Sequence, residues 1–457
     1  MVPGTGYWVL INFATGSITR LDAFQKELFE IAPELPEELP VIAGWKKGGF
    51  LTDITDEAAW MHDQIEESFR ALEQGKQVRP LTLRLYTTYA CNFRCSYCFQ
   101  DGRGGPMSRD VQDAVAAFAE ESFRTWKHDA LKVEWYGGEP LLEPGIIEDL
   151  SRRFIDIADS HGAAYSANIT TNGWFLDQRM TDMLERVKVK TAYITLDGIG
   201  DLHDQCRHLA NGGPTSQRII HNLRSIRTSV FISLRCNLHK GNLSGFGELC
   251  DLVEELSAQS GNTIRLIPAK VEITPRVEKR DHHVIPVSSE ELEWAYKRSG
   301  YTAKKDPFQP KLMLCRGTDP FGFIIDEKGL IFPNCNNHAE EKNNAFGSLT
   351  DGSSMKDIYQ KSFEHARSWS FPADSADCKS CRMLICCNGG CPSHAFERGR
   401  HFCLERVSDP ESYAIMRYHK AFDEHETRIY NNFEDMEEKH GSEIIDNIEE
   451  TPKRALS

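Results

Sequence analysis

Residues 81–98 read LTLRLYTTYACNFRCSYC, an apolar run that passes directly into three closely spaced cysteines. The run Leu81–Thr88 is rich in leucine, tyrosine and threonine, and it predicts a strand. Cys91, Cys95 and Cys98 then lie on one short loop at the carboxyl end of that strand. Spacings of three and two intervening residues force the thiols to converge. The stretch therefore indicates a site for a metal or a metal-containing cofactor.

The chain beyond this stretch alternates strands and helices. Further strand-like runs occupy Lys132–Tyr136, Ser166–Thr171, Thr191–Leu196, Val230–Asn237 and Ile264–Pro268. Segments of helical period lie between them, among them Arg109–Thr125, Ile146–Ser160 and Ser216–Arg227. Such alternation implies parallel pairing with right-handed crossovers, so we expect an α/β fold. About six units predict a partial (β/α)6 barrel, TIM-like but not closed, with its chemistry on the loops that follow the strands.

Three thiolates allow two metal assignments. A [4Fe–4S] cluster normally takes four cysteines, so three leave one iron open to a small chelating molecule. Three thiolates with a water or a distant histidine could instead hold zinc tetrahedrally. The position of the loop after a strand, together with the residues downstream, favours the cluster.

Composition excludes several classes of protein. The 457 residues carry 53 Lys and Arg against 68 Asp and Glu, a net charge of -15, so the chain lacks the basic footprint of a nucleic-acid binder. No apolar stretch approaches the roughly 20 residues needed to span a bilayer. The run Tyr7–Ala14 is short for a signal peptide, and no Lys or Arg precedes Arg20. We therefore expect a cytoplasmic protein, without a membrane partner, whose 14 cysteines are reduced.

The CxxxCxxC motif, with the aromatic Tyr97 before its last cysteine, resembles that of the radical S-adenosylmethionine (SAM) superfamily. The resemblance implies that Cys91, Cys95 and Cys98 hold a [4Fe–4S] cluster and that the amino and carboxylate groups of SAM chelate the open iron. Reductive cleavage of SAM then yields a 5′-deoxyadenosyl radical that abstracts hydrogen from the substrate. An external reductant such as flavodoxin or ferredoxin is implied as the electron donor.

Residues at the ends of the other predicted strands also resemble SAM-binding motifs of this superfamily. Tyr136 is followed by Gly137-Gly138-Glu139-Pro140, which resembles the family's GGEP motif for the methionine amino group. Its glycines allow close backbone approach to a ligand, and Glu139 can accept from an ammonium. An arginine near the cofactor would pair with a carboxylate, although a plain surface charge remains an alternative for Arg207 and Arg235. The expected cofactor-binding set is Tyr97, Gly137, Gly138, Glu139, Pro140, Thr171, Asn172, Asp197, Arg207 and Arg235.

The last third of the chain is rich in cysteine and resembles the SPASM extension of radical enzymes that mature peptides and proteins. The resemblance implies two auxiliary [4Fe–4S] clusters. It assigns Cys315, Cys335 and Cys391 to the first, and Cys378, Cys381, Cys387 and Cys403 to the second. The first set has three thiolates, so its fourth ligand stays open, with Cys386 as a spare candidate. Gly329 precedes Cys335 by five intervening residues where the family usually has four, which predicts a one-residue bulge. A pair of zinc knuckles is the alternative.

Composition, period and the resemblance together divide the chain into five expected parts. Residues 1–75 form a small winged-helix-like, peptide-recognition-like module, 80–270 the partial barrel, 271–312 a linker, 313–408 the SPASM extension, and 409–457 a tail that begins helical and ends charged. Within the family, this arrangement looks most like maturases that install thioether or carbon–carbon crosslinks in ribosomally made precursor peptides, or epimerise their residues. The N-terminal strand could bind such a peptide by strand addition, or merely cap the barrel.

Two alternative functions remain. Sulfatase-maturating enzymes, which make formylglycine, also resemble this chain, but the aspartate that serves them as a base is Asn336 here, and an amide cannot accept that proton near neutral pH. A non-catalytic iron–sulfur or zinc scaffold is the alternative of another class, and the GGEP motif and the three-thiolate loop argue against it. The sequence names neither the peptide, the bond formed nor the catalytic acid or base.

Overall fold

The computed structural model describes residues 2, 5–12, 17–54, 56–100, 104–271, 284–301, 316–335 and 344–370, with positions 378, 381, 384–387, 390, 391 and 422. The chain divides into two compact units. The smaller comprises Met1–Glu66, Lys305–Leu314 and Ser370–Ser457, and the larger comprises Glu67–Lys304 and Cys315–Trp369.

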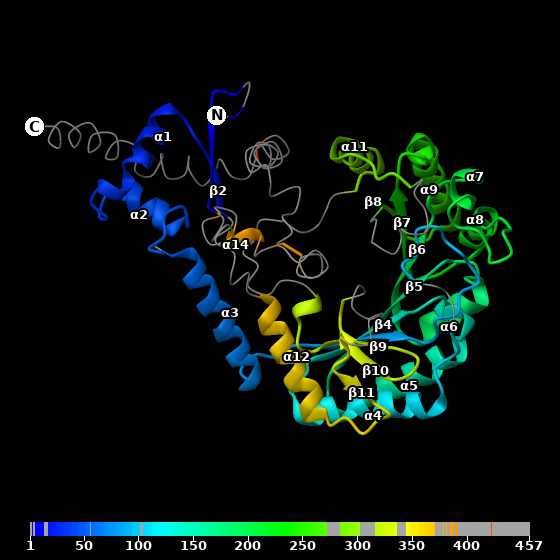
Figure 1. Ribbon diagram of the computed structural model, residues 1–457. Helices are drawn as coiled ribbons and strands as arrows, with labels where there is room; N and C mark the ends of the chain where they lie inside the picture. Colours follow the sequence, from blue (N-terminus) through cyan, green and yellow to red (C-terminus); the bar gives the residue numbers. More distant parts are fainter. Residues whose placement is uncertain are drawn as a thin grey trace, which may run out of the picture. The chain divides into compact units, whose positions relative to one another are not determined.

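A nine-stranded sheet forms the core of the larger unit, in the order β11-β10-β9-β3-β4-β5-β6-β7-β8. Six of its strands are parallel neighbours in chain order: β3 (Leu81–Tyr86), β4 (Ala130–Tyr136), β5 (Ala164–Thr171), β6 (Val189–Thr195), β7 (Phe231–Leu238) and β8 (Ile264–Lys270). The sheet curves but does not close (Figure 1). The predicted partial barrel of six strand–helix units is confirmed.

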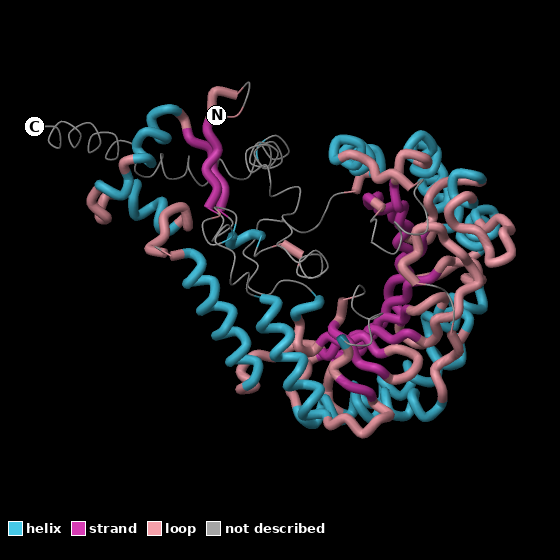
Figure 2. The backbone as a smooth tube through the Cα atoms, viewed as in Figure 1, coloured by secondary structure: helices cyan, strands magenta, loops and turns pink. Residues whose placement is uncertain are grey.

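Helices cover the outer face of this sheet (Figure 2). They include α4 (Arg109–Thr125), α5 (Pro144–Ser160), α6 (Gln178–Arg186), α8 (Ser216–Ser225) and α9 (Phe246–Ser260), with the short α7 (Asp201–Asp204) before α8. Trp135 of β4 packs on Phe154 of α5, with ring centroids 6.4 Å apart. Alternate strand residues face these helices because side chains switch faces along a strand. The buried apolar layer therefore holds the strands in place and leaves their carboxyl ends to the loops.

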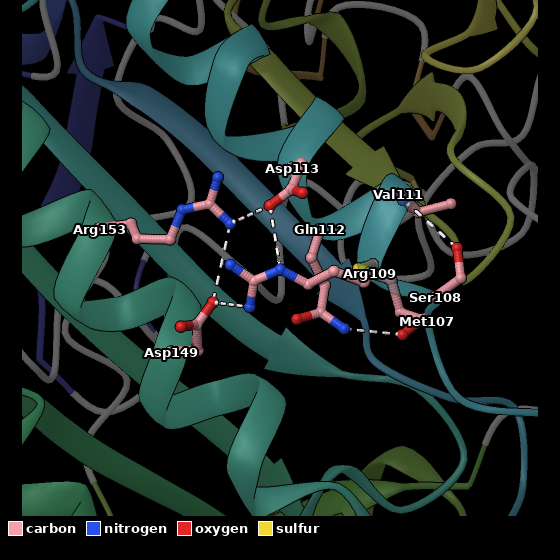
Figure 3. Close-up of polar contacts among 8 residues, drawn as sticks. All are labelled: Met107, Ser108, Arg109, Val111, Gln112, Asp113, Asp149 and Arg153. Carbon is pink, nitrogen blue, oxygen red and sulfur yellow. Dashed lines mark hydrogen bonds and ion pairs between the residues drawn. The ribbon is translucent and has the colours of Figure 1, made fainter.

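Salt bridges add to the contact between α4 and α5 (Figure 3). Arg109 lies 3.2 Å from Asp113 and 2.9 Å from Asp149, and Arg153 lies 2.8 Å from Asp113. Ser108 caps α4 by accepting from the amide of Val111. These exposed pairs contribute little each, so the buried apolar layer carries most of the stability of this contact.

Three strands extend the sheet beyond β3. β9 (Gly322–Ile325) lies parallel to β3, and β10 (Leu330–Pro333) and β11 (Gly347–Ser348) follow antiparallel. Gly329 has a φ of +83° and lies in the turn between β9 and β10. Asp326 accepts there from the amides of Lys328 and Leu330, which fixes the turn. The glycine expected to mark a bulge thus lies at a hairpin, and part of the expected extension continues the barrel sheet.

A further helix lies within the segment that was expected to be a linker. Helix α11 (Ser289–Ser299) is capped by Ser288, whose hydroxyl accepts from the amide of Glu291 while the Glu291 side chain accepts from the amide of Ser288. It ends at Gly300 in the left-handed conformation. Capping at both ends stabilises a short helix. The segment expected to be a linker thus contains a capped helix.

The smaller unit begins with an antiparallel hairpin of β1 (Trp8–Asn12) and β2 (Ser17–Leu21). The helices α1 (Ala23–Glu30) and α2 (Pro40–Lys47) follow, and α3 (Glu57–Glu73) continues into the larger unit. Trp45 is buried with Ile42 and contacts Phe29 edge to face. The short α14 (Leu384–Cys387) also belongs here. Among the helices that the structure describes, none has the length and apolar character to cross a bilayer.

Candidate functional site

The loop with the first three cysteines lies at the carboxyl end of β3, as predicted, and it pairs with a second loop that follows α7. The amide of Arg94 donates to the carbonyl of His208 at 2.9 Å, and the amide of Ser96 donates to that of Cys206 at 2.9 Å. A third bond joins the amide of Ala210 to the carbonyl of Asn92. These backbone bonds fix the loop on both sides of Cys95.

Burial disfavours bare thiolates at Cys91 and Cys95. Burial raises the pKa of Cys91 to about 11, with a contribution from the nearby Glu139. Burial also raises the pKa of Cys95 to about 12, although the positive charge of Arg207 opposes the rise, and Cys91 and Cys98 raise it further. Because metal binding requires deprotonated cysteine, a metal that compensates these charges would convert the thiols to thiolates.

The two glycines of the GGEP turn lie directly against the backbone that leads into the cysteine loop. A Cβ on Gly137, whose φ is +126°, would lie 2.3 Å from the carbonyl oxygen of Thr88. One on Gly138 would lie 2.2 Å from that of Ala90. The amides of Gly138 and Glu139 donate to the same two carbonyls at 2.8 and 2.9 Å. The sequence predicted that these glycines allow close approach of a ligand. The space beside their Cα atoms is instead filled by the chain's own backbone.

Glu139 is fully buried and links the GGEP turn to the end of β5. Its carboxylate accepts from the amide of Leu141 at 3.0 Å, from the hydroxyl of Thr171 at 2.7 Å and from the amide of Asn172 at 2.7 Å. Burial raises the pKa of Glu139 to about 7, and these hydrogen bonds oppose that rise. A carboxylate offers about four lone-pair sites, so one remains for a further donor such as an ammonium.

Asn172 extends this network to the first cysteine. Its side-chain nitrogen donates to the Oδ1 of Asn92 at 2.8 Å and lies 4.0 Å from the sulfur of Cys91. The amide of Phe93 also points at this sulfur, at 3.4 Å. Glu139, Asn172 and Cys91 are therefore connected by a continuous chain of polar contacts.

A second buried network surrounds Tyr97, between Cys95 and Cys98. The hydroxyl of Tyr97 donates to Asp197, while Arg207 and Asn237 donate to it at 3.1 and 3.2 Å. Asp197 also accepts from the amide of Asn237 at 2.8 Å. The guanidinium of Arg207 lies 5.9 Å from the centre of the Tyr97 ring. This network ties the cysteine loop to the ends of β6 and β7.

Charge within this second network is compensated locally. Burial raises the pKa of Asp197, and the charge of Arg207 opposes the rise. Burial by itself lowers the pKa of Arg207, but the charges of Cys95, Tyr97 and Asp197 raise it well above its usual range. Arg235 is exposed and donates through Nε to the side-chain oxygen of Asn237 at 2.7 Å. Arg207 is therefore not an isolated surface charge, whereas Arg235 keeps an exposed charge beside Asn237.

His203 and Asp204, on α7, form hydrogen bonds with the backbone around this network. The ring nitrogen Nδ1 of His203, a fully buried residue, accepts from the amide of Asp197 at 3.0 Å. Asp204 accepts from the amides of Thr215 and Ser216 at the start of α8, at 2.7 and 2.8 Å. His203 and Asp204 therefore fix different parts of the site.

The cysteines expected to hold auxiliary clusters are distributed over both units. Cys335 lies two residues after β10 in the larger unit, and Cys378, Cys381, Cys387 and Cys391 belong to the smaller one. The amide of Cys381 donates to the carbonyl of Cys378 at 3.1 Å, so this pair shares one turn. Cys315, Cys403, Asn336 and the Cys386 side chain lie outside the described residues, as does the tail that was expected to begin helical. Cys206, Cys236 and Cys250 are buried.

The residues around the first cysteine loop fit a bound cluster and SAM. Three buried polar atoms, Asn92 Nδ2, Ser96 Oγ and Arg207 Nε, have no hydrogen-bond partner in the part of the chain that the structure describes. Cluster sulfurs and a carboxylate are acceptors that such donors can use. Within the same described residues, no three His, Cys, Asp or Glu side chains converge as the ligands of a single metal ion do. A cubane lets each thiolate bind its own iron.

Comparison with known proteins supports the same assignment. The model of the Radical SAM superfamily matches residues 85–252. Fe-coproporphyrin III synthase of Methanosarcina barkeri is 22% identical over 184 residues, covering 40% of this chain and 43% of that protein. The sporulation killing factor maturation protein SkfB of Bacillus subtilis is 22% identical over 197 residues, covering 43% and 44%. The chain thus spans less than half the length of these curated relatives.

Two solved structures share the fold. Streptococcus suis SuiB bound to S-adenosylmethionine superimposes with a TM-score of 0.51 at 15% identity, covering 88% of this chain and 98% of SuiB. The enzyme anSMEcpe with bound AdoMet and the Cp18Cys peptide gives a TM-score of 0.50 at 16% identity, covering 76% and 96%.

Proposed function

We propose that this chain, a radical SAM enzyme whose matched domain spans residues 85–252, modifies a ribosomally made peptide. One observation carries the radical chemistry: three thiols lie on a loop at the carboxyl end of β3, between the Glu139 network and the Tyr97 network. A cluster bound by three cysteines has an iron open to SAM, and its electron would generate the 5′-deoxyadenosyl radical.

Each network has a separate task in this proposal. Cys91, Cys95 and Cys98 hold the cluster. Glu139 accepts from the amino group of SAM through its remaining lone-pair site, while Thr171 and Asn172 orient the carboxylate of Glu139. The other residues of the expected cofactor-binding set would line the SAM site: Tyr97, Gly137, Gly138, Pro140, Asp197, Arg207 and Arg235.

The orienting role of Tyr97 follows from its bonds. Its ring cannot rotate out of place while Asp197, Arg207 and Asn237 all contact the hydroxyl. The loop between Cys95 and Cys98 is held in turn, so the cluster would sit at a fixed distance from the bound cofactor. Buried hydrogen-bonded networks of this kind rigidify a site.

A peptide substrate is supported by the relatives. SkfB is named as a maturation protein for a killing factor, and anSMEcpe is seen with a bound peptide. We propose the same substrate class here, with thioether or carbon–carbon crosslinking or epimerisation as the reaction. The auxiliary clusters on Cys315, Cys335 and Cys391 and on the four cysteines Cys378, Cys381, Cys387 and Cys403 are part of this proposal, as is a flavodoxin or ferredoxin as the reductant.

Anaerobic reconstitution tests the radical chemistry. With iron, sulfide, SAM and dithionite, the protein should release 5′-deoxyadenosine, and alanine at Cys91, Cys95 or Cys98 should abolish it. Iron analysis should give about eleven to twelve irons for three clusters. A preparation that binds zinc in place of iron, or that leaves SAM intact, contradicts the proposal.

A further inference from the structure

The two faces of the parallel sheet differ sharply in chemistry. The strand register places the outward residues in one layer, and these are apolar and buried, as Val133, Ile169 and Leu234 illustrate. The alternate residues form the inner face, on the concave side of the sheet in Figure 1. Polar and charged side chains dominate this inner face: Arg84, Lys132, Glu134, Asn168, Thr170, Thr191, Tyr193, Ser233, Arg235 and Arg265.

The charges on the inner face are mostly positive. In strands β3–β8, the inner positions carry four cations, Arg84, Lys132, Arg235 and Arg265, and one carboxylate, Glu134. Glu134 is already occupied, because Arg84 donates to it at 2.6 and 2.8 Å. Arg316, at the start of the short helix before β9, adds a fifth cation at 2.6 Å from the same carboxylate. The chain as a whole has a net charge of -15, so this face opposes the overall charge.

Three of these cations stay without a counter-charge. Lys132, Arg235 and Arg265 are exposed, and none of them forms an ion pair with a carboxylate of the described residues. Arg265 instead lies over the ring of Phe231 on the same face, 5.5 Å from its centre. Because the inner carboxylate Glu134 is paired with Arg84 and Arg316, the remaining cations of this face can attract an anionic partner.

Their spacing selects the kind of anion. Lys132 lies on β4 and Arg265 on β8, four strand steps apart in the sheet, or roughly 19 Å along it. One phosphate or one carboxylate is too small to contact both residues. An extended chain with several negative charges could contact both.

We propose that the inner face of the sheet binds an acidic segment of the peptide substrate. The inference rests on the proposed function and narrows its substrate class to peptides with several Asp or Glu residues in the bound segment. Lys132 and Arg265 contact the carboxylates, while Arg84 and Glu134 stay paired with each other on the same face. The segment then lies on the concave side of the sheet, at whose carboxyl edge the three cysteines lie.

Fluorescence anisotropy on the oxygen-free, reconstituted protein tests this assignment. The probes are labelled twelve-residue peptides of alternating sequence, (Glu-Ala)6, (Gln-Ala)6 and (Lys-Ala)6. We expect the acidic peptide to bind about tenfold or more tightly than the neutral one, and this preference to shrink when salt rises from about 0.05 to 0.3 M. Arg235 is left unchanged because it contacts Asn237 in the SAM site.

A matched pair of variants decides whether the inner face is responsible. The double variant K132E/R265E should weaken binding of (Glu-Ala)6 about tenfold and improve binding of (Lys-Ala)6, since it reverses two inner charges. R179E/R186E changes the total charge equally on α6, outside the sheet, and should change little. Equal binding of acidic and neutral peptides, equal effects of the two double variants, or displacement of the acidic peptide by equimolar GTP overturns the proposal.

The same samples separate this inference from the proposed function. Circular dichroism and iron content report whether K132E/R265E folds, and K132Q/R265Q provides a milder variant with the same expected direction. If the protein releases 5′-deoxyadenosine but shows no preference for the acidic peptide, this inference alone is contradicted. If the unsubstituted protein releases no 5′-deoxyadenosine, the proposed function is contradicted.

Discussion

The hydroxyl of Tyr97 donates a hydrogen bond to the carboxylate of Asp197, a residue 100 positions later in the chain. This bond joins the cysteine loop after β3 to the carboxyl end of β6, and Arg207 and Asn237 complete the contact. The aromatic residue before the last cysteine therefore has a structural task that a phenylalanine could not perform.

The variant Y97F should weaken SAM binding and lower the yield of 5′-deoxyadenosine. Removing the hydroxyl leaves Asp197 and Arg207 buried with one partner fewer, at a cost of about 1–3 kcal/mol. Equilibrium binding of SAM to the reduced protein measures the effect. The matched control is Y165F, which removes a buried hydroxyl that contacts Ser151 far from the cysteine loop. Equal SAM affinity in Y97F and the unsubstituted protein would show that the network does not position the loop.

The variant G138A should prevent assembly of the first cluster. A methyl group there would meet the carbonyl oxygens of Ala90 and Tyr89 at 2.2 and 2.4 Å, so the loop that carries Cys91 has to move. Iron content and the absorbance of the reconstituted protein report the loss. The control is G145A in the first turn of α5, where a Cβ meets nothing within 4 Å. A full complement of iron in G138A would contradict the close packing described here.

Protein stability should fall between pH 6.5 and 5 because of His203. Burial lowers the pKa of His203 to about 3, followed by the charge of Arg207, whereas an unfolded histidine titrates near 6.5. The unfolded state then binds more protons in this range, so stability is full above the unfolded pKa and declines as the pH falls.

Urea unfolding at several pH values measures the contribution of His203. When the pH falls from 7 to 5, protonation of His203 in the unfolded state should lower the free energy of unfolding by about 2 kcal/mol, since each pKa unit is worth about 1.4 kcal/mol. In H203N this part of the pH dependence should disappear, although the variant is less stable at every pH. Parallel pH profiles for the two proteins would show that His203 is protonated in the folded state.

The salt bridges of this protein should differ widely in their effects. The variant E134A leaves the buried guanidinium of Arg84 without a counter-charge, and about 3–5 kcal/mol of stability should be lost. The variant R109A removes the exposed bridges to Asp113 and Asp149 and should cost less than about 1 kcal/mol. Denaturant midpoints measured side by side give the comparison. Similar losses in the two variants would contradict the burial described for Arg84.

Local sequence patterns were enough to predict the helices and strands that form the core of the barrel. Helix α4 has the predicted bounds Arg109–Thr125, because Ser108 caps its start and its apolar face is periodic. The strand predictions also agree within a few residues, since β-branched, aromatic and other apolar residues alternate in these strands with polar ones. The start of α11 at Ser288 could have been predicted from its capping box with Glu291.

Long-range contacts could not be predicted in this way. Nothing local in Gly322–Ile325 indicates that β9 pairs with β3, more than 230 residues earlier. The packing partners of Gly137 and Gly138 are equally invisible, because a glycine that accommodates a ligand and one that accommodates backbone look alike in sequence. The bonds from Tyr97 to Asp197 and Asn237 depend on strand order, which only the folded sheet provides.

Electron paramagnetic resonance of the dithionite-reduced, oxygen-free protein with and without SAM tests the central claim most directly. A C315A/C335A/C378A/C381A/C387A/C391A/C403A background, which lacks the seven cysteines proposed for the two auxiliary clusters, leaves the cluster of Cys91, Cys95 and Cys98 as the expected source of the spectrum. The account predicts a [4Fe–4S] signal whose g-values shift when SAM is added, and which is lost when Cys91, Cys95 or Cys98 is replaced by alanine. A signal that is indifferent to SAM, or one that survives all three replacements, contradicts it.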